Sequence, residues 1–190
     1  MTQFISGFNY YGYKYYKSMS FEGAVNKYLD ELEGFSEKHT DCKLRACHKF
    51  VNGQANDLGF KFKEYLLMGG IVRRKEFVRD YINKLEDELD LVLITEEFTL
   101  SMVLIAHKYC MAYEDIYFMK SNESKRKVQV CEKTKERIKL LLSIDYQIYE
   151  HFKDLFYEAV KKEGVTDDDV AQFIEENDEK SKSCTDGKQV

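Results

Sequence analysis

Two adjacent carboxylates, Glu96 and Glu97, stand where an apolar run meets the start of a helical pattern, and they are the first candidates for chemistry. The run 91–94 is typical of a short buried strand. The side chains that follow at helical spacing are Phe98, Met102, Ile105 and Tyr109. Ligands of open α/β sheets bind beyond the carboxyl ends of strands, so both carboxylates are placed to accept hydrogen bonds from a ligand. A structural role is equally open, because acids in a first turn stabilise a helix by roughly 0.3–1 kcal/mol each.

Asp145 is the next candidate, because it interrupts the apolar face of a long helix predicted over residues 134–161. The apolar residues three or four positions away are Leu141, Leu142, Ile148 and Tyr149. A buried ionised carboxylate must be paired or hydrogen-bonded. Asp145 is therefore either a carboxylate at the edge of a binding cleft or a structural acceptor for backbone or basic groups.

Two other polar clusters are weaker candidates for a functional site. A basic loop is able to meet phosphates or an anionic membrane, although charged loops are more often simply solvated. Its members are Lys120, Lys125, Arg126 and Lys127. A second cluster has metal-ligand residue types but matches no zinc spacing, so we expect no metal. Its members are His39, Cys42, Cys47 and His48.

The bulk composition indicates a soluble globular chain of one domain. It has 190 residues, 44% of them hydrophobic, and a formal net charge of −5, which gives no sign of a nucleic-acid partner. Proline and tryptophan are absent. Neither a signal peptide nor a membrane span is visible in the sequence.

The periodicity predicts a helix-rich chain with a short sheet. Besides 134–161, we expect helices over 20–34, 60–68 and 75–86, a strand over 89–95, and a second extended segment over 115–119. Ser20 is expected to cap the helix over 20–34. Gly164 is expected to end the long helix, and Thr166 to cap a final helix whose first turn holds three aspartates. Residues 175–190 are expected to fray.

Three segments resemble the galactose 3-O-sulfotransferase family. The stretch 89–110, LDLVLITEEFTLSMVLIAHKYC, is similar to a family strand followed by Glu, an aromatic pair, a Ser-Leu helix start and a later Cys. Glu96 matches the family Glu, whereas Glu97 replaces an aromatic residue. The family's Asp-Leu-Gly-Phe motif is similar to 57–60, and 142–152 resembles a helix with the pattern Leu-Asp-x-x-Leu-Tyr-x-x-Phe.

The first residues resemble the end of the family's 3′-phosphate motif, in which an Arg-Asp-Pro turn precedes a serine. Ser6 matches that serine, and the arginine would lie before Met1. The phosphosulfate-binding loop has no counterpart within residues 1–190. The resemblance thus implies the C-terminal portion of a catalytic domain, and we expect this chain to be inactive alone.

The resemblance implies an α/β fold: the helix-rich C-terminal part of a P-loop-like sulfotransferase with a partial parallel sheet. It divides the chain into a partial sulfotransferase domain, 1–163, and a C-terminal helix with a polar tail, 164–190. The donor would be 3′-phosphoadenylyl sulfate, bound partly by Ser6. The acceptor would be a galactose-terminated glycolipid or glycan, such as galactosylceramide, bound by Asp57, Glu96 and Asp145.

The resemblance also implies a setting on the lumenal side of the Golgi membrane, with an anchor upstream and a glycan on Asn122, the Asn of the sequon Asn-Glu-Ser. The general base is not identified. Two alternatives stay open: a non-catalytic fragment that binds a partner, and a relative that sulfates uronic acids at the 2-hydroxyl.

Overall fold

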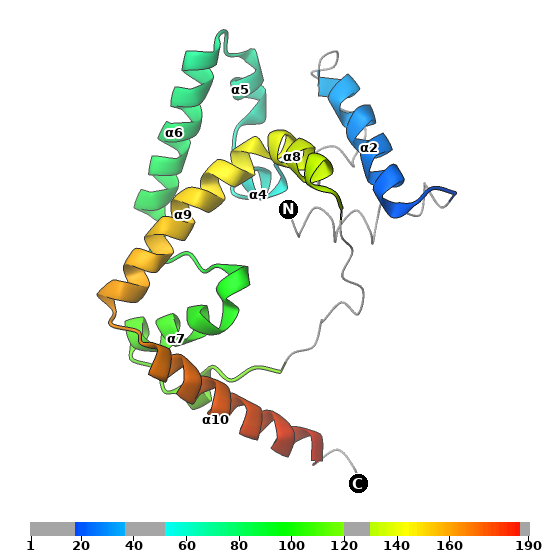
Figure 1. The fold of residues 1–190 in the computed structure, drawn as a ribbon. Helices are drawn as coiled ribbons and strands as arrows, with labels where there is room; N and C mark the ends of the chain where they lie inside the picture. The colour runs from blue at the N-terminus through cyan, green and yellow to red at the C-terminus, as the bar shows by residue number, and fades with distance from the viewer. Residues whose placement is uncertain (1–17, 37–51, 120–129, 187–190) are drawn as a thin grey trace. The chain divides into compact units, whose positions relative to one another are not determined.

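The computed structural model describes residues 18–36, 52–119 and 130–186, and its regular elements are helices (Figure 1). The chain divides into two compact units. Unit 1 combines Met1–Asp87 with Arg126–Glu150, and unit 2 combines Glu88–Lys125 with His151–Val190. Within the described ranges, no helix is both long enough and apolar enough to cross a bilayer.

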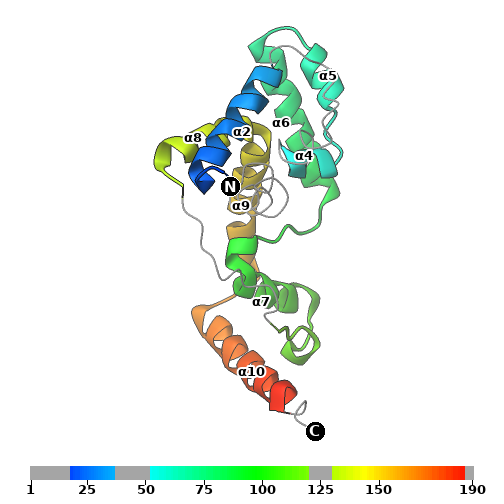
Figure 2. The same ribbon diagram turned by 90° about the vertical axis from the view of Figure 1, so that its right-hand side faces the viewer.

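Unit 1 is built mainly from five helices of the described segments, turned to a second view in Figure 2. They are α2 (Phe21–Ser36), α4 (Gly53–Asp57), α5 (Phe62–Leu67), α6 (Ile71–Glu88) and α8 (Glu132–Leu141). The predicted cap of the first helix is confirmed, since the Ser20 hydroxyl accepts a hydrogen bond from the Gly23 amide at 3.1 Å. The predicted helices over 60–68 and 75–86 are also confirmed, as α5 and α6.

A polar network joins α2 to α8 across more than a hundred residues of sequence. The Glu22 carboxylate accepts hydrogen bonds from the Cys131 amide and the Thr134 hydroxyl, each at 3.1 Å. Arg137 donates to Asn26 at 2.9 Å and to Asp30 at 2.6 Å. Because Thr134 is buried, these bonds satisfy polar groups that burial would otherwise leave unpaired.

The prediction of one helix over 134–161 was wrong, because the chain breaks it at Leu142. Helix α8 ends at Leu141 and α9 (Ser143–Lys162) begins directly after. The side chain of Asn52 lies at this break, as described below. The apolar periodicity runs through both helices, so it could not reveal the interruption.

Unit 2 contains the second half of α9 together with η3 (Thr95–Glu97), α7 (Phe98–Tyr109), η4 (Tyr113–Asp115) and α10 (Asp167–Asp186). Its core includes Val103, Ala106, Ile116 and Phe173. Thr166 caps α10 as predicted: the Asp169 amide donates to the Thr166 hydroxyl at 3.2 Å, and the Thr166 amide donates back to Asp169 at 2.8 Å. Gly164, at φ +68°, follows the end of α9 as predicted.

Two predictions concern the C-terminal region: fraying from residue 175 and a domain division at residue 163. Residues 175–186 continue α10, so the predicted fraying from residue 175 was wrong for this part. Glu176 accepts a hydrogen bond from the Tyr117 hydroxyl at 2.7 Å, and the buried Asn177 accepts one from the Phe118 amide at 2.8 Å. These contacts explain why the helix continues past residue 175. The proposed division at residue 163 stays a prediction.

The residues predicted as a strand, 89–95, form no strand in the described segments: the chain bends at Asp90, residues 91–94 are irregular, and Thr95 already begins η3. Ile94 has φ −105° and ψ 119°, which are strand-like angles. Its backbone amide and carbonyl both bond the Ser101 hydroxyl, at 3.3 and 3.2 Å. The buried serine thus satisfies backbone groups that a neighbouring strand would satisfy in a sheet, and the parallel sheet itself stays a prediction.

Candidate functional site

The Asp145 carboxylate caps the short helix α4 from a distant part of the chain. Its oxygens accept hydrogen bonds from the Ala55 amide at 2.8 Å and the Gln54 amide at 3.2 Å. These amides lie in the first turn of α4, where helical N–H groups have no partner within the helix. The structure therefore gives Asp145 the structural acceptor role that its position in the apolar face left open.

The side chain of Asn52, which was not among the residues predicted from the sequence, bonds in turn to the backbone around Asp145. Its side-chain oxygen accepts hydrogen bonds from the Ile144 amide at 2.9 Å and the Asp145 amide at 3.1 Å. Its amide nitrogen donates to the Leu141 carbonyl at 3.2 Å. Asn52 thus satisfies the end of α8 and the start of α9 together, which gives a physical reason for the break at Leu142.

The backbone of Asn52 is unusual as well. It is left-handed, at φ +50°, and the residue is buried. Asparagine tolerates this conformation better than most residues, and Asn-Gly pairs favour it. The pair Asn52-Gly53 was the available sequence signal. We call the reciprocal pair Asn52 and Asp145 the α4–α9 latch.

The electrostatics of the latch are set mainly by burial. Desolvation raises the pKa of Asp145, and the negative charge of Asp57 acts in the same direction. The amide donors of Ala55 and Gln54 act in the opposite direction, because they favour the ionised form. The result is a half-buried carboxylate with a raised pKa whose hydrogen bonds hold backbone in place.

Asp57 is the last residue of α4 and is exposed. The rest of its motif ends the helix: the Phe60 amide bonds the Ala55 carbonyl at 2.8 Å, and the Gly59 amide bonds the Asn56 carbonyl at 3.0 Å. Gly59 has φ +90°, so this is a Schellman ending that needs glycine. The latch fixes the beginning of α4 and this ending fixes its last turn, so Asp57 is presented to solvent by a short helix held at both ends.

Glu96 and Glu97 lie together in η3 of unit 2 but differ in their surroundings. Glu96 is exposed, as an acceptor-binding residue would need to be. Glu97 is partly buried and accepts a hydrogen bond from the Tyr157 hydroxyl of α9 at 2.8 Å. Of the two carboxylates, Glu97 therefore has the structural contact, and the acceptor role of Glu96 stays a prediction.

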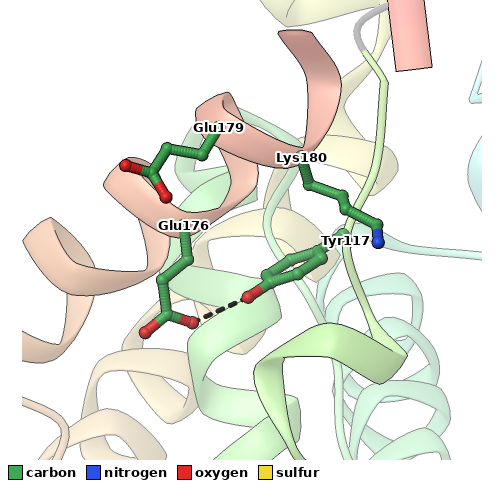
Figure 3. A pocket seen from close by; sticks show the side chains of 4 residues that line it. All are labelled: Tyr117, Glu176, Glu179 and Lys180. Carbon is green, nitrogen blue, oxygen red and sulfur yellow. Dashed lines mark hydrogen bonds between the residues drawn. The ribbon is translucent and has the colours of Figure 1, made fainter. Parts of the chain in front are cut away.

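Unit 2 also has an open pocket of about 320 Å³, which contains no residue predicted for the site. Its lining residues are Tyr117, Glu176, Glu179 and Lys180. Figure 3 shows that three of them project from α10 around Tyr117, whose hydroxyl donates to Glu176 at 2.7 Å. The hydrogen bond to Glu176, with burial and the charges of nearby carboxylates, raises the pKa of Tyr117 to about 12.

Replacing Glu176 by glutamine should lower the pKa of Tyr117 toward the ordinary value of 10.0, because the hydrogen bond to the carboxylate is the largest cause of the shift. Glu179→Gln should move it less, since Glu179 acts only through its charge. The measurement is ¹³C NMR titration of ring-labelled tyrosine. Since the chain has 14 tyrosines, Tyr117→Phe assigns the resonance. An unchanged pKa in Glu176→Gln would show that the hydrogen bond does not form.

Comparison of the sequence with known protein families gives a match over the whole chain. Residues 1–190 match the family described as galactose-3-O-sulfotransferase. The chain belongs to this family. Curated proteins and solved structures give no match. Membership makes the protein a sulfotransferase by family, which implies 3′-phosphoadenylyl sulfate as the sulfate donor and an acceptor that contains a sugar.

Several residues singled out from the sequence lie outside the part of the chain that the structure describes. Ser6 and Asn122 lie outside the described residues, as do His39 and His48. His107 lies in unit 2 with its Nε2 atom 3.9 Å from Asp169, and no catalytic base is assigned. Over the part of the chain that the structure describes, no group of three potential metal ligands occurs.

Proposed function

We propose that the protein transfers a sulfuryl group from 3′-phosphoadenylyl sulfate to the 3-hydroxyl of a galactose on a glycolipid or glycan. The observation that supports this most is the family match over the whole chain. In the reaction, the galactose oxygen bonds to sulfur as the bond from sulfur to the donor's phosphate oxygen breaks. The hydroxyl proton passes to a general base. The proposed setting is the lumenal side of the Golgi membrane.

Ser6 is proposed to contact the donor. A serine hydroxyl is suited to hold the 3′-phosphate, because hydrogen bonds to charged oxygens are strong and fix the nucleotide without reacting with it. The support is its resemblance to the serine of the family's 3′-phosphate motif.

The acidic residues are proposed to serve the acceptor in two ways. Asp57 and Glu96 each have an exposed carboxylate, which is free of the hydrogen bonds to backbone amides that occupy Asp145. We propose direct contacts with sugar hydroxyls for each of these two residues. Asp145 we propose as a positioning residue, because it holds the helix that presents Asp57.

The test is transfer of radiolabelled sulfate by the full-length gene product to three acceptors: galactosylceramide, lactosylceramide and a galactoside methylated at O3. We expect label on the first two and none on the third, because methylation removes the reacting hydroxyl. Equal labelling of the methylated galactoside would place the reaction at another hydroxyl. No labelling of any galactose acceptor, beside labelling of a uronic acid acceptor, would favour the uronyl alternative.

A further inference from the structure

Helices α5 and α6 form a hairpin with its own aromatic core. Figures 1 and 2 both show the two helices side by side. Phe60 is buried at its base, with ring centroids 4.7 Å from Phe62, 4.9 Å from Tyr81 and 5.5 Å from Phe77. Edge-to-face contacts of this kind stabilise a pair beyond the area that it buries. The hairpin is therefore a packed element.

The tip of this hairpin exposes large apolar side chains. The exposed fractions are 72% for Leu67, 75% for Ile71 and 70% for Val72, and Leu66 beside them is 47% exposed. The connection between the helices is Met68-Gly69-Gly70, with Gly70 at φ +86°. We call Leu66, Leu67, Ile71 and Val72 the hairpin tip. Scattered exposed apolar residues are ordinary, but four within seven positions at one turn form a patch.

Arg74 holds the tip in shape. Its Nε atom donates to the Met68 carbonyl at 3.1 Å, and its Nη2 atom donates to the Leu66 carbonyl at 3.2 Å. Its guanidinium carbon also lies 5.5 Å from the centre of the Tyr65 ring. Since these contacts satisfy carbonyls of the turn, the backbone is ordered while the apolar side chains remain outside. The exposed apolar side chains of the tip therefore belong to a turn whose backbone is held by hydrogen bonds.

Basic residues surround the tip. Between residues 61 and 75 the chain has one acidic residue, Glu64, which lies 3.4 Å from Lys61. The basic residues of this segment are Lys61, Lys63, Arg73, Arg74 and Lys75. We call these five residues the positive collar. It is a local cluster of positive charge on a chain whose net charge is −5. An anionic surface is the partner that such a collar attracts.

We propose that the hairpin tip inserts into the interfacial layer of a bilayer that carries anionic lipids. Its apolar side chains would enter the boundary of headgroups and acyl chains while the collar contacts the headgroup charges. A second copy of this chain is a poorer occupant, because a two-fold contact between tips would bring two positive collars together. The proposal does not depend on the sulfotransferase reaction, since it concerns attachment to the membrane.

The chain has no tryptophan, so a single introduced tryptophan reports its own environment. In Leu67→Trp we expect a blue-shifted emission on adding phosphatidylcholine vesicles that contain phosphatidylserine, and quenching when the lipids are brominated. Leu140→Trp is the matched control, because Leu140 is 78% exposed on α8 of the same unit but stands as a single exposed apolar side chain, on a helix that carries Glu132 and Glu136 among its basic residues. It should show neither effect. No response of Leu67→Trp to these vesicles would overturn the proposal.

Binding strength gives an independent measure. Leu67→Ser combined with Ile71→Ser should weaken partitioning onto the anionic vesicles on the order of tenfold, because two exposed apolar side chains no longer enter the interface. Leu140→Ser should leave it unchanged. Arg73→Gln with Lys75→Gln should weaken binding at low salt and matter little at high salt. Emission that shifts with protein concentration in the absence of vesicles would assign the tip to self-association and overturn the membrane proposal.

Discussion

Replacing Asn52 by alanine should lower the free energy of unfolding by about 3 kcal/mol, a large effect for one side chain. The substitution removes all three hydrogen bonds of the latch that Asn52 forms, those to Leu141, Ile144 and Asp145. A buried group left without its partner costs about 1–3 kcal/mol. Alanine is also strained at φ +50°, which adds about 1 kcal/mol. Urea denaturation followed by circular dichroism measures the change.

Two further variants separate the hydrogen bonds from the backbone strain. Asn52→Gly loses the side chain but accepts the left-handed conformation, so it should be more stable than Asn52→Ala by about 1 kcal/mol. Asn52→Asp keeps an acceptor for the Ile144 and Asp145 amides but cannot donate to Leu141. It also puts a second negative charge beside Asp145, so we expect it to be destabilised at neutral pH and less so in acid. If alanine costs less than about 0.5 kcal/mol, as at an ordinary surface position, the latch does not hold the two helices.

The sequence predicted those features whose causes lie within a few residues. Ser20 caps a helix through an amide three residues away, and Thr166 pairs with Asp169 across the same spacing. Gly164 follows the end of α9 because its own backbone adopts a left-handed angle. Such signals depend on local geometry alone, so residue type and position are sufficient to predict them.

The break at Leu142 had no such local cause. The apolar spacing continues through it, and the residue responsible, Asn52, lies about 90 positions earlier in the chain. The hydrogen bond of Glu97 was not predicted for the same reason, because its partner Tyr157 lies in another helix. Long-range pairing of polar groups leaves almost no trace in periodicity, because one side chain is enough to make it.

Asp145 is the intermediate case. The sequence showed that a carboxylate in an apolar face needs partners, but it could not say whether those partners were backbone, a cation or a ligand. The structure supplies two amides of α4, so the residue implied by the family resemblance as an acceptor contact is occupied by structural bonds. In the function proposed above, Asp145 acts on the acceptor only indirectly, by holding the short helix that ends at Asp57.

Asp145→Ala should cost about 1–3 kcal/mol of unfolding free energy, because the first-turn amides of α4 lose both acceptor oxygens. Glu150→Ala is the matched control on the same helix, since Glu150 is exposed, and it should change stability by less than about 0.5 kcal/mol. Lys139 is a less suitable control, because its ammonium lies 5.8 Å from the centre of the Tyr146 ring. Equal denaturation midpoints for Asp145→Ala and Glu150→Ala would show that the latch contributes nothing.

Asp145→Asn tests the electrostatics of the same site through pH. Burial raises the folded-state pKa of Asp145 above the ordinary 3.8, so the unfolded chain releases this proton more readily. The stability of the native protein relative to Asp145→Asn should therefore be greatest below pH 3.8 and should fall as the pH rises through the raised folded value. If the advantage of the native protein over Asp145→Asn instead grows with pH, the amide donors outweigh burial, and the carboxylate is held in its ionised form by α4.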